Sequence, residues 1–146
     1  MSIASYFATA PKHLESLLAD ELSGLGLTDV AETRGGARFR GRLQDAYRAC
    51  LWSRVANRVL LPLTEFPIRD ADELYAGARE IPWERHLDAR GSLAVQLDGT
   101  GAGISHSKYG ALRVKDAIVD RIRDLTGARP WVDTERPDVR VHAYLH

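Results

Sequence analysis

The side chains best suited to chemistry lie close together along the chain. Six of them carry a hydroxyl, an imidazole or a positive charge: Ser105, His106, Ser107, Lys108, Arg113 and Lys115. They stand where a glycine-rich stretch, 99–103, gives way to a predicted helix. The first N–H groups of a helix have no partner within it, so a helix start rich in hydroxyls and cations is typical of anion binding. The sequence therefore predicts contact with a phosphate, of either a nucleotide or a nucleic acid.

The glycine-rich stretch makes a nucleotide the weaker of these two alternatives. A dinucleotide fingerprint that begins at Gly99 requires a glycine at position 104, where the chain has Ile104. The fingerprint also requires a second parallel strand with an acidic residue about 20 positions later, and the sequence predicts no such unit. A nucleotide-binding role for residues 99–103 is therefore kept only as an alternative.

A nucleic-acid phosphate agrees better with the residues that follow the glycines. Lys108 and Lys115 fall on one side of the predicted helix, and Tyr109 is able to stack on a base. Such contacts position RNA through its backbone and shape and carry little sequence information. The structural alternative is that Tyr109 lies at the core boundary and that the lysine stems cover apolar surface. The residues alone leave both interpretations open.

A second group of cations lies in the first half of the chain. Arg38, Arg40 and Arg42 alternate with apolar residues after the turn at Gly35 and Gly36, so they share one face of a predicted strand. Charged residues on an edge strand prevent aggregation, which is one explanation. The other is an auxiliary strip that contacts RNA phosphates.

No catalytic residue and no metal ligand is predicted. The histidines, at positions 13, 86, 106, 142 and 146, lack the spacing of metal ligands, and Cys50 is the one cysteine. No G-x-S-x-G nucleophile motif is present. We expect Cys50 to be a small core residue and the acidic residues between 70 and 88 to form a solvated face. The chain alone is therefore not expected to be an enzyme.

The elements that carry these residues predict an α+β protein with two domains. Residues 1–66 read as a strand (6–9), a helix (from 11), a hairpin (30–41), a helix (43–53) and a strand (58–66). This β-α-β-β-α-β order is that of a ferredoxin-like domain. Apolar spacing predicts that the second helix buries five residues: Leu43, Ala46, Tyr47, Cys50 and Leu51.

Residues 67–146 are predicted to form a second, α/β domain. Two short helices (71–80 and 82–87) precede a strand (92–97), a long helix (108–125), a loop (128–137) and a last strand (138–146). The long helix is expected to bury one apolar stripe: Ala111, Val114, Ile118, Ile122 and Leu125. Its mixed charges are expected on a solvated face: Arg113, Asp116, Asp120 and Arg123.

Composition indicates a cytoplasmic protein with no general affinity for nucleic acid. The 20 basic and 20 acidic residues give zero net charge, so any nucleic-acid role must come from local patches. A single cysteine fits a reducing compartment. No apolar run approaches the roughly 20 residues that span a bilayer, and the N-terminal residues do not have the pattern of a signal peptide. We therefore expect no membrane partner.

Three longer segments resemble a known family: AYRACLWSRVANRVLLPLTEF, SKYGALRVKDAIVD and RPWVDTERPDVRVHAYLH. Together they are similar to the N-terminal region of the bacterial large-subunit (23S) ribosomal RNA guanine-N2 methyltransferases. That region resembles a ferredoxin-like domain followed by a THUMP domain, and the similarity covers essentially the whole chain. It implies a THUMP domain over 67–146 that lacks the partner strand of its last hairpin.

The resemblance also implies that RNA binding and methyl transfer belong to different domains. In that family a C-terminal Rossmann-like domain transfers the methyl group from S-adenosylmethionine, and its two sequence motifs do not occur in this chain. THUMP domains resemble one another in binding structured RNA, through a segment similar to residues 104–115. The resemblance thus implies an RNA-binding substrate-recognition module, with ribosomal RNA and the missing methyltransferase domain as partners and no cofactor of its own. A structural module that docks that domain without binding RNA is the alternative.

Overall fold

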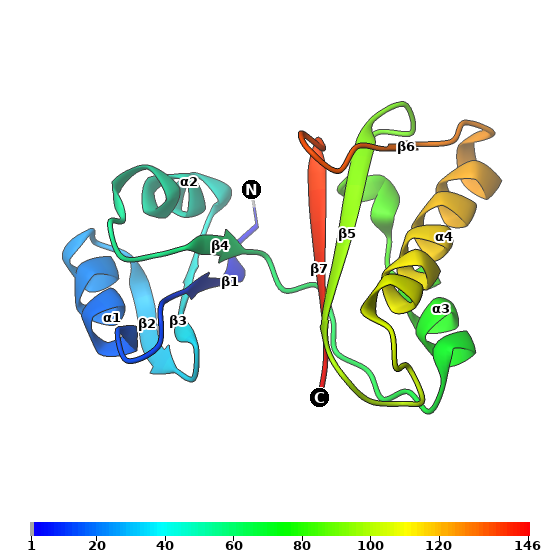
Figure 1. Ribbon diagram of the computed structural model, residues 1–146. Coiled ribbons are helices and arrows are strands. Elements are labelled where there is room, and N and C mark those ends of the chain that lie inside the picture. Colours follow the sequence, from blue (N-terminus) through cyan, green and yellow to red (C-terminus); the bar gives the residue numbers. More distant parts are fainter. Residues whose placement is uncertain (1) are drawn as a thin grey trace. The chain divides into compact units, whose positions relative to one another are not determined.

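The computed structural model describes residues 2–146, which divide into two compact units; the first ends at Leu63 and the second is Thr64–His146 (Figure 1). Each unit has its own sheet and its own cluster of buried side chains. None of the core residues described belongs to both clusters, which is the property of two domains.

The first unit has the predicted β-α-β-β-α-β order. Its elements are β1 (Ala4–Thr9), α1 (Glu15–Gly24), β2 (Thr28–Thr33), β3 (Gly36–Gly41), α2 (Leu43–Trp52) and β4 (Arg58–Leu60). The strands form an antiparallel sheet in the order β2-β3-β1-β4. The prediction of a ferredoxin-like domain in an α+β protein is confirmed.

Both helices of the first unit pack on one face of this sheet. The buried cluster combines strand and helix residues: Tyr6, Ala8, Ala37, Phe39, Leu18, Leu22, Ala46 and Ala49. The rings of Tyr6 and Phe39, paired across β1 and β3, stack with their centroids 5.5 Å apart. Because side chains alternate along a strand, Arg38 and Arg40 lie on the opposite, open face, where both are exposed.

Helix α2 differs from the prediction in the face that it buries. Only Ala46 and Ala49 are buried, whereas Tyr47 exposes 64% and Leu51 exposes 75% of its surface. Cys50 is also exposed, so its assignment to the core was wrong. The two alanines, three residues apart, let the helix backbone approach the sheet closely. The larger apolar side chains are therefore left on the outside.

The strand predicted over 58–66 is much shorter, because β4 ends at Leu60. Pro62 follows two residues later and has no N–H group to extend the ladder. Phe66 packs against the core of the second unit, and its ring occupies the space that a Cβ at Gly77 would need. The two units therefore divide at Leu63–Thr64, whereas the boundary predicted from the sequence lies between residues 66 and 67.

The second unit consists of α3 (Ala71–Arg79), the 3-10 helix η1 (Trp83–Arg85), β5 (Ser92–Gly99), α4 (Ser107–Thr126), β6 (Trp131–Val132) and β7 (Val139–Leu145). Both β6 and β7 run parallel to β5, in the order β6-β5-β7. Helices α3 and α4 lie against the same side of this sheet (Figure 1). That β7 lacks a hairpin partner stays a prediction.

The core of the second unit lies between the sheet and α4. Every second residue of β7 packs into this core: Val139, Val141, Ala143 and Leu145. Trp83 is 3% exposed, and its indole N–H donates to the carbonyl of Ala78 at 2.7 Å.

Helix α4 buries most of the predicted stripe but not its last member. Val114, Ile118 and Ile122 are buried, whereas Leu125 exposes 58% of its surface. Every residue of the helix after Ile122 is exposed, because the last turn extends beyond the core. Gly127 then ends the helix in the left-handed conformation, with φ of 75°.

Candidate nucleic-acid interface

The N-terminal end of α4 leaves its polar groups open to solvent. His106 is the N-cap residue, and Ser105, His106, Ser107 and Lys108 are all exposed. No side chain in the described part of the chain caps this end, and its first turn contains no acidic residue. By contrast, the Asp70 carboxylate caps α3 by accepting from the N–H of Glu73 at 2.8 Å. The start of α4 therefore combines free N–H groups, hydroxyls and a cation, which suits an anion.

Tyr109 and Lys115 extend this surface to different degrees. The Tyr109 side chain exposes 51% of its surface and does not belong to the core, so its ring is accessible for stacking. Lys115 has only 19% of its side chain exposed, and its Nζ lies 2.6 Å from Oδ1 of Asp116. Lys108 forms no ion pair within residues 2–146. Lys108 is therefore the more available of the two cations.

The sequence predicted that Arg113 lies on a solvated face, but the structure places its side chain against α3. Its guanidinium stacks over the Tyr75 ring, 4.5 Å from the centroid, and its Nη2 lies 3.4 Å from Oδ1 of Asp72. Its Nε is buried without a hydrogen-bond partner among the described residues. Arg113 thus joins α4 to α3, whereas the Asp72 side chain is 91% exposed, as expected for the solvated acidic face.

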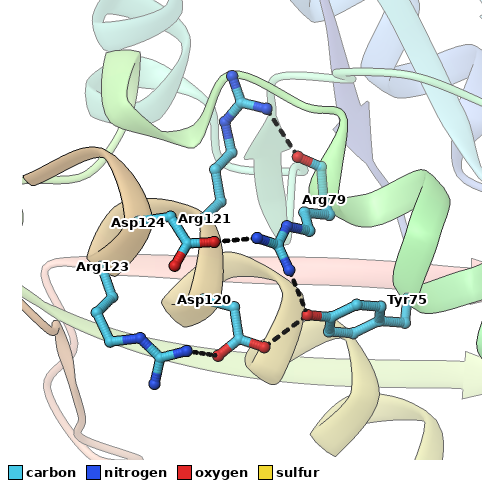
Figure 2. Close-up of polar contacts among 6 residues, drawn as sticks. All are labelled: Tyr75, Arg79, Asp120, Arg121, Arg123 and Asp124. Carbon is cyan, nitrogen blue, oxygen red and sulfur yellow. Dashed lines mark hydrogen bonds and ion pairs between the residues drawn. The ribbon is translucent and has the colours of Figure 1, made fainter.

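The same helix pair is joined by a network of tyrosine, arginine and aspartate side chains (Figure 2). The Tyr75 hydroxyl donates to Asp120 at 2.6 Å and accepts from Arg79 at 2.8 Å. The bond to Asp120 is the main reason why the pKa of Tyr75 is raised; burial adds to the rise, and the bond from Arg79 opposes it. Arg79 also pairs with Asp124. The face of α4 that carries Asp120 is therefore a contact with α3, and the prediction of a solvated face there was wrong.

Arg121 completes this contact on the side of η1. Its guanidinium forms two hydrogen bonds to Glu84, of 2.9 and 3.0 Å, and one to the carbonyl of Arg79 at 2.8 Å. The hydrogen bonds from Arg121 are the main reason why the pKa of Glu84 falls from 4.5 to about 2. Sequence reasoning missed this network. The signal was present in the i, i+4 pairs Tyr75/Arg79 and Asp120/Asp124, which place each pair on one face of its helix.

The glycines of residues 99–103 have structural roles, so a nucleotide site is not needed to explain them. Gly99 pairs with Leu145 of β7, and a Cβ at this position would overlap the Leu145 carbonyl oxygen. The N–H of Ile104 donates to the carbonyl of Gly101 at 2.9 Å, which closes a tight turn. Gly99 and Gly103 have φ of 86° and 72°, a conformation that favours glycine. Backbone geometry therefore accounts for these residues.

The arginine strip divides between the sheet and a helix. Arg38 and Arg40 project from the open face of β3, as predicted. Arg42 stands at the start of α2, where its backbone N–H donates to the Asp45 carboxylate at 2.8 Å. Arg38 and Arg40 belong to the first unit and the start of α4 belongs to the second, so each unit carries its own candidate residues.

No three His, Cys, Asp or Glu side chains within residues 2–146 lie where they could hold a metal ion. None of the helices over the same residues has the length and hydropathy to cross a membrane.

Family models match both units. The model of the RlmL ferredoxin-like domain matches residues 5–60, and the model of the THUMP domain matches residues 68–146. The ribosomal RNA large subunit methyltransferase K/L of Allochromatium vinosum is 54% identical over 144 residues, which cover 99% of this chain and 20% of that protein. The protein of the same name from Pseudomonas aeruginosa is 52% identical over 139 residues, which cover 95% of this chain and 19% of that protein. The chain thus spans about a fifth of the length of these curated relatives.

Solved structures share the fold of the chain. A predicted N6-adenine-specific DNA methylase from Listeria monocytogenes matches with a TM-score of 0.85 and 26% identity, over 99% of this chain and 38% of that one. A 4-thiouridine synthetase in complex with RNA matches with a TM-score of 0.56 and 12% identity, over 99% of this chain and 39% of that one. The second likeness concerns the fold alone.

Proposed function

The chain belongs to the THUMP domain family, with an RlmL ferredoxin-like domain before its THUMP domain, and on that basis we propose that it holds ribosomal RNA for a methyltransferase. More specifically, it is the substrate-recognition module of an S-adenosylmethionine-dependent large-subunit (23S) ribosomal RNA guanine-N2 methyltransferase. The relatives that support this proposal carry the name ribosomal RNA large subunit methyltransferase K/L. The guanine-N2 position rests on the resemblance of the sequence segments given above.

The open N-terminal end of α4 is the observation that carries the RNA-binding role. It presents Ser105, His106, Ser107 and Lys108 to solvent on a helix of 20 residues whose first turn has no carboxylate. The helix dipole and unpaired N–H groups attract a phosphate, and Lys108 adds a full charge. Tyr109, one residue further on, is exposed enough to stack on an unpaired base.

The methyl transfer itself belongs outside this chain in our proposal. S-adenosylmethionine would supply the methyl group, but the residues present here do not fit it, since the glycines of 99–103 are used in strand pairing and a tight turn. We therefore assign no catalytic or cofactor-binding residue within the chain. The remaining four-fifths of the relatives' length offers room for a methyltransferase domain.

Removing the α4 cation tests the proposed RNA contact. The chain has three lysines, so Lys108→Ala and Lys115→Ala are compared with Lys12→Ala, an exposed lysine of the first unit. Binding to a structured ribosomal RNA fragment is measured by fluorescence anisotropy at several salt concentrations. Lys108→Ala should reduce the slope of log K against log salt by about 0.7 to 0.9, one phosphate contact. Lys115→Ala should reduce it less, because Asp116 already neutralises its charge.

The control should leave affinity and slope as in the wild-type chain. If the Lys108→Ala, Lys115→Ala double variant keeps the wild-type slope, α4 is not in the RNA interface.

A second candidate function, protein docking, is favoured by the outer face of α2. Leu43, Tyr47 and Leu51 are spaced four residues apart and expose 46%, 64% and 75% of their surfaces, and Trp52 beside them exposes 62%. An apolar helix face of this kind marks an interaction site. The partner we propose is the methyltransferase part of the longer relatives.

The docking function is tested by adding that part in trans. Tyr47→Ser with Leu51→Ser should weaken its association with the chain and leave RNA binding unchanged. Equal association of the variant and the wild-type chain would remove α2 from the docking surface.

A further inference from the structure

The open face of the first sheet carries a row of residues that the α4 surface does not use. Strand register places Phe7 of β1 between Arg38 of β3 and Leu60 of β4. The same register pairs Ser5 with Arg40 and Thr9 with Arg58. Residues paired across antiparallel strands have side chains on the same face, about 4.5–5.5 Å apart at Cβ. One aromatic ring in a central strand is thus bordered by cations.

Phe7 has no role in the core of either unit. It is half-buried, and it is absent from both hydrophobic clusters, as is its neighbour Leu60. Tyr6 and Ala8, on either side of Phe7 in β1, are buried in the core, and Ala4 packs against it. The fold therefore leaves this ring on the solvent side of the sheet, where a flat partner could cover it.

The cations around Phe7 are available to an anion. Arg38, Arg40 and Arg58 are exposed, and none of them forms an ion pair with another residue in 2–146. The paired positions on this face carry no Asp or Glu. In the second unit, by contrast, four arginines of α3 and α4 pair with carboxylates: Arg79, Arg113, Arg121 and Arg123.

We propose that the open face of the first sheet binds a single-stranded segment of RNA, with a base stacked on Phe7 and the backbone phosphates on Arg38, Arg40 and Arg58. Four-stranded sheets with an aromatic residue on a central strand stack unpaired bases in this way, and neighbouring cations track the phosphates. A duplex offers no free base face to a ring in the middle of a sheet. Arg42 has no part in this site, because it begins α2.

The proposal rests on the proposed function for its class of ligand, but it concerns a different surface on a different unit. Its test uses the whole chain, an unstructured RNA oligonucleotide with a 5′ fluorophore and a closed RNA hairpin. Phe7→Leu removes the ring and keeps an apolar side chain. Tyr47→Leu makes a comparable change at an exposed aromatic residue of α2, outside the open face. Arg38→Ala with Arg40→Ala probes the phosphate contacts, with Arg48→Ala on α2 as their control.

Phe7→Leu should weaken binding of the oligonucleotide between about 5-fold and about 150-fold, the range of one base–aromatic stack, and should affect the hairpin less. The double arginine variant should lower the salt slope by about 1.4, since each lost contact to a single strand contributes about 0.7. Ultraviolet cross-linking followed by mass spectrometry should locate a nucleotide on Phe7.

Unchanged oligonucleotide binding by Phe7→Leu, or an equal loss with Tyr47→Leu, would overturn the proposal. The proposed α4 site and the proposed sheet-face site can be refuted independently. A loss with Lys108→Ala and none with Phe7→Leu keeps the α4 site and removes the sheet face. The reverse result keeps the sheet face and removes α4.

Discussion

Tyr75 shows how a single side chain of the second unit holds helices α3 and α4 together. Its hydroxyl bridges Asp120 and Arg79, and its ring supports the guanidinium of Arg113. Tyr75→Phe removes the first two contacts and keeps the third. It also leaves a half-buried carboxylate without one of its donors. We expect a loss of about 1–2 kcal/mol in the free energy of unfolding of the second unit, the usual effect of such a hydrogen bond.

The matched control is Tyr109→Phe, whose hydroxyl makes no hydrogen bond with another residue in 2–146. Urea unfolding, followed by the amide signals of α3 and α4, measures both variants. A smaller effect at Tyr75 than at Tyr109 would contradict the assigned role.

Glu84 supplies a prediction about pH. Its pKa falls from 4.5 to about 2 in the folded chain, chiefly because Arg121 donates hydrogen bonds to it. A carboxyl whose pKa is lowered by folding stabilises the fold above its unfolded pKa. That contribution is lost as the pH falls from about 4.5 through about 2.

An NMR titration of the Glu84 carboxyl carbon should therefore have its midpoint near pH 2, and Arg121→Gln should move the midpoint back toward 4.5. Arg85→Gln is the control, because Arg85 lowers the pKa least among the causes. An unmoved midpoint in Arg121→Gln would show that this pair does not persist in solution.

At the scale of elements, the sequence predicted which helices and strands exist better than it predicted their buried faces. The order of elements in the first unit followed from apolar spacing, Pro11 and the turn at Gly35 and Gly36. The faces of α2 were misassigned because its contact with the sheet uses Ala46 and Ala49, and alanine is compatible with either side of a helix. Apolar periodicity cannot distinguish a buried stripe from one that is left exposed for a partner.

The candidate site was predictable only in part, for a related reason. The strand, loop and helix around residues 99–126 followed from glycines and periodicity, so the position of Ser105 to Lys108 at a helix start could be expected. That α3 would take Arg113 and Asp120 as its partners depended on tertiary contacts between residues about 40 positions apart. Likewise Phe7 looked like one more apolar residue of a strand until register placed it opposite Arg38.

The pairing of β5 with β7 depends on one glycine. A Cβ at Gly99 would overlap the Leu145 carbonyl oxygen, and its φ of +86° is unfavourable for other residues. Gly99→Ala should destabilise the second unit by about 1–3 kcal/mol, from backbone strain and a displaced strand end. Gly24→Ala is the control, since nothing lies within 4 Å of its Cβ position and its φ is not positive. Hydrogen exchange of the β7 amides checks the outcome, and unchanged protection in Gly99→Ala would contradict it.

At the scale of the whole molecule, the two separate cores determine how far the effect of a core substitution extends. Phe39 is fully buried in the first core and Ile118 is fully buried in the second. Replacing either with alanine leaves a cavity and costs about 3–5 kcal/mol for Phe39 and about 2–5 kcal/mol for Ile118. These losses are a large part of the stability of a small domain.

Because the described clusters share no residue, each loss should stay within its own unit. Phe39→Ala should lower amide protection over β1 to β4 and leave α3, α4 and β5 protected, whereas Ile118→Ala should do the reverse. Hydrogen exchange followed by mass spectrometry resolves the two sets of peptides. If each variant lost protection across both units, the chain would unfold as one cooperative body. Separate unfolding would instead allow the sheet face and the start of α4 to be tested one at a time, because a variant in one unit would leave the other unit's surface folded.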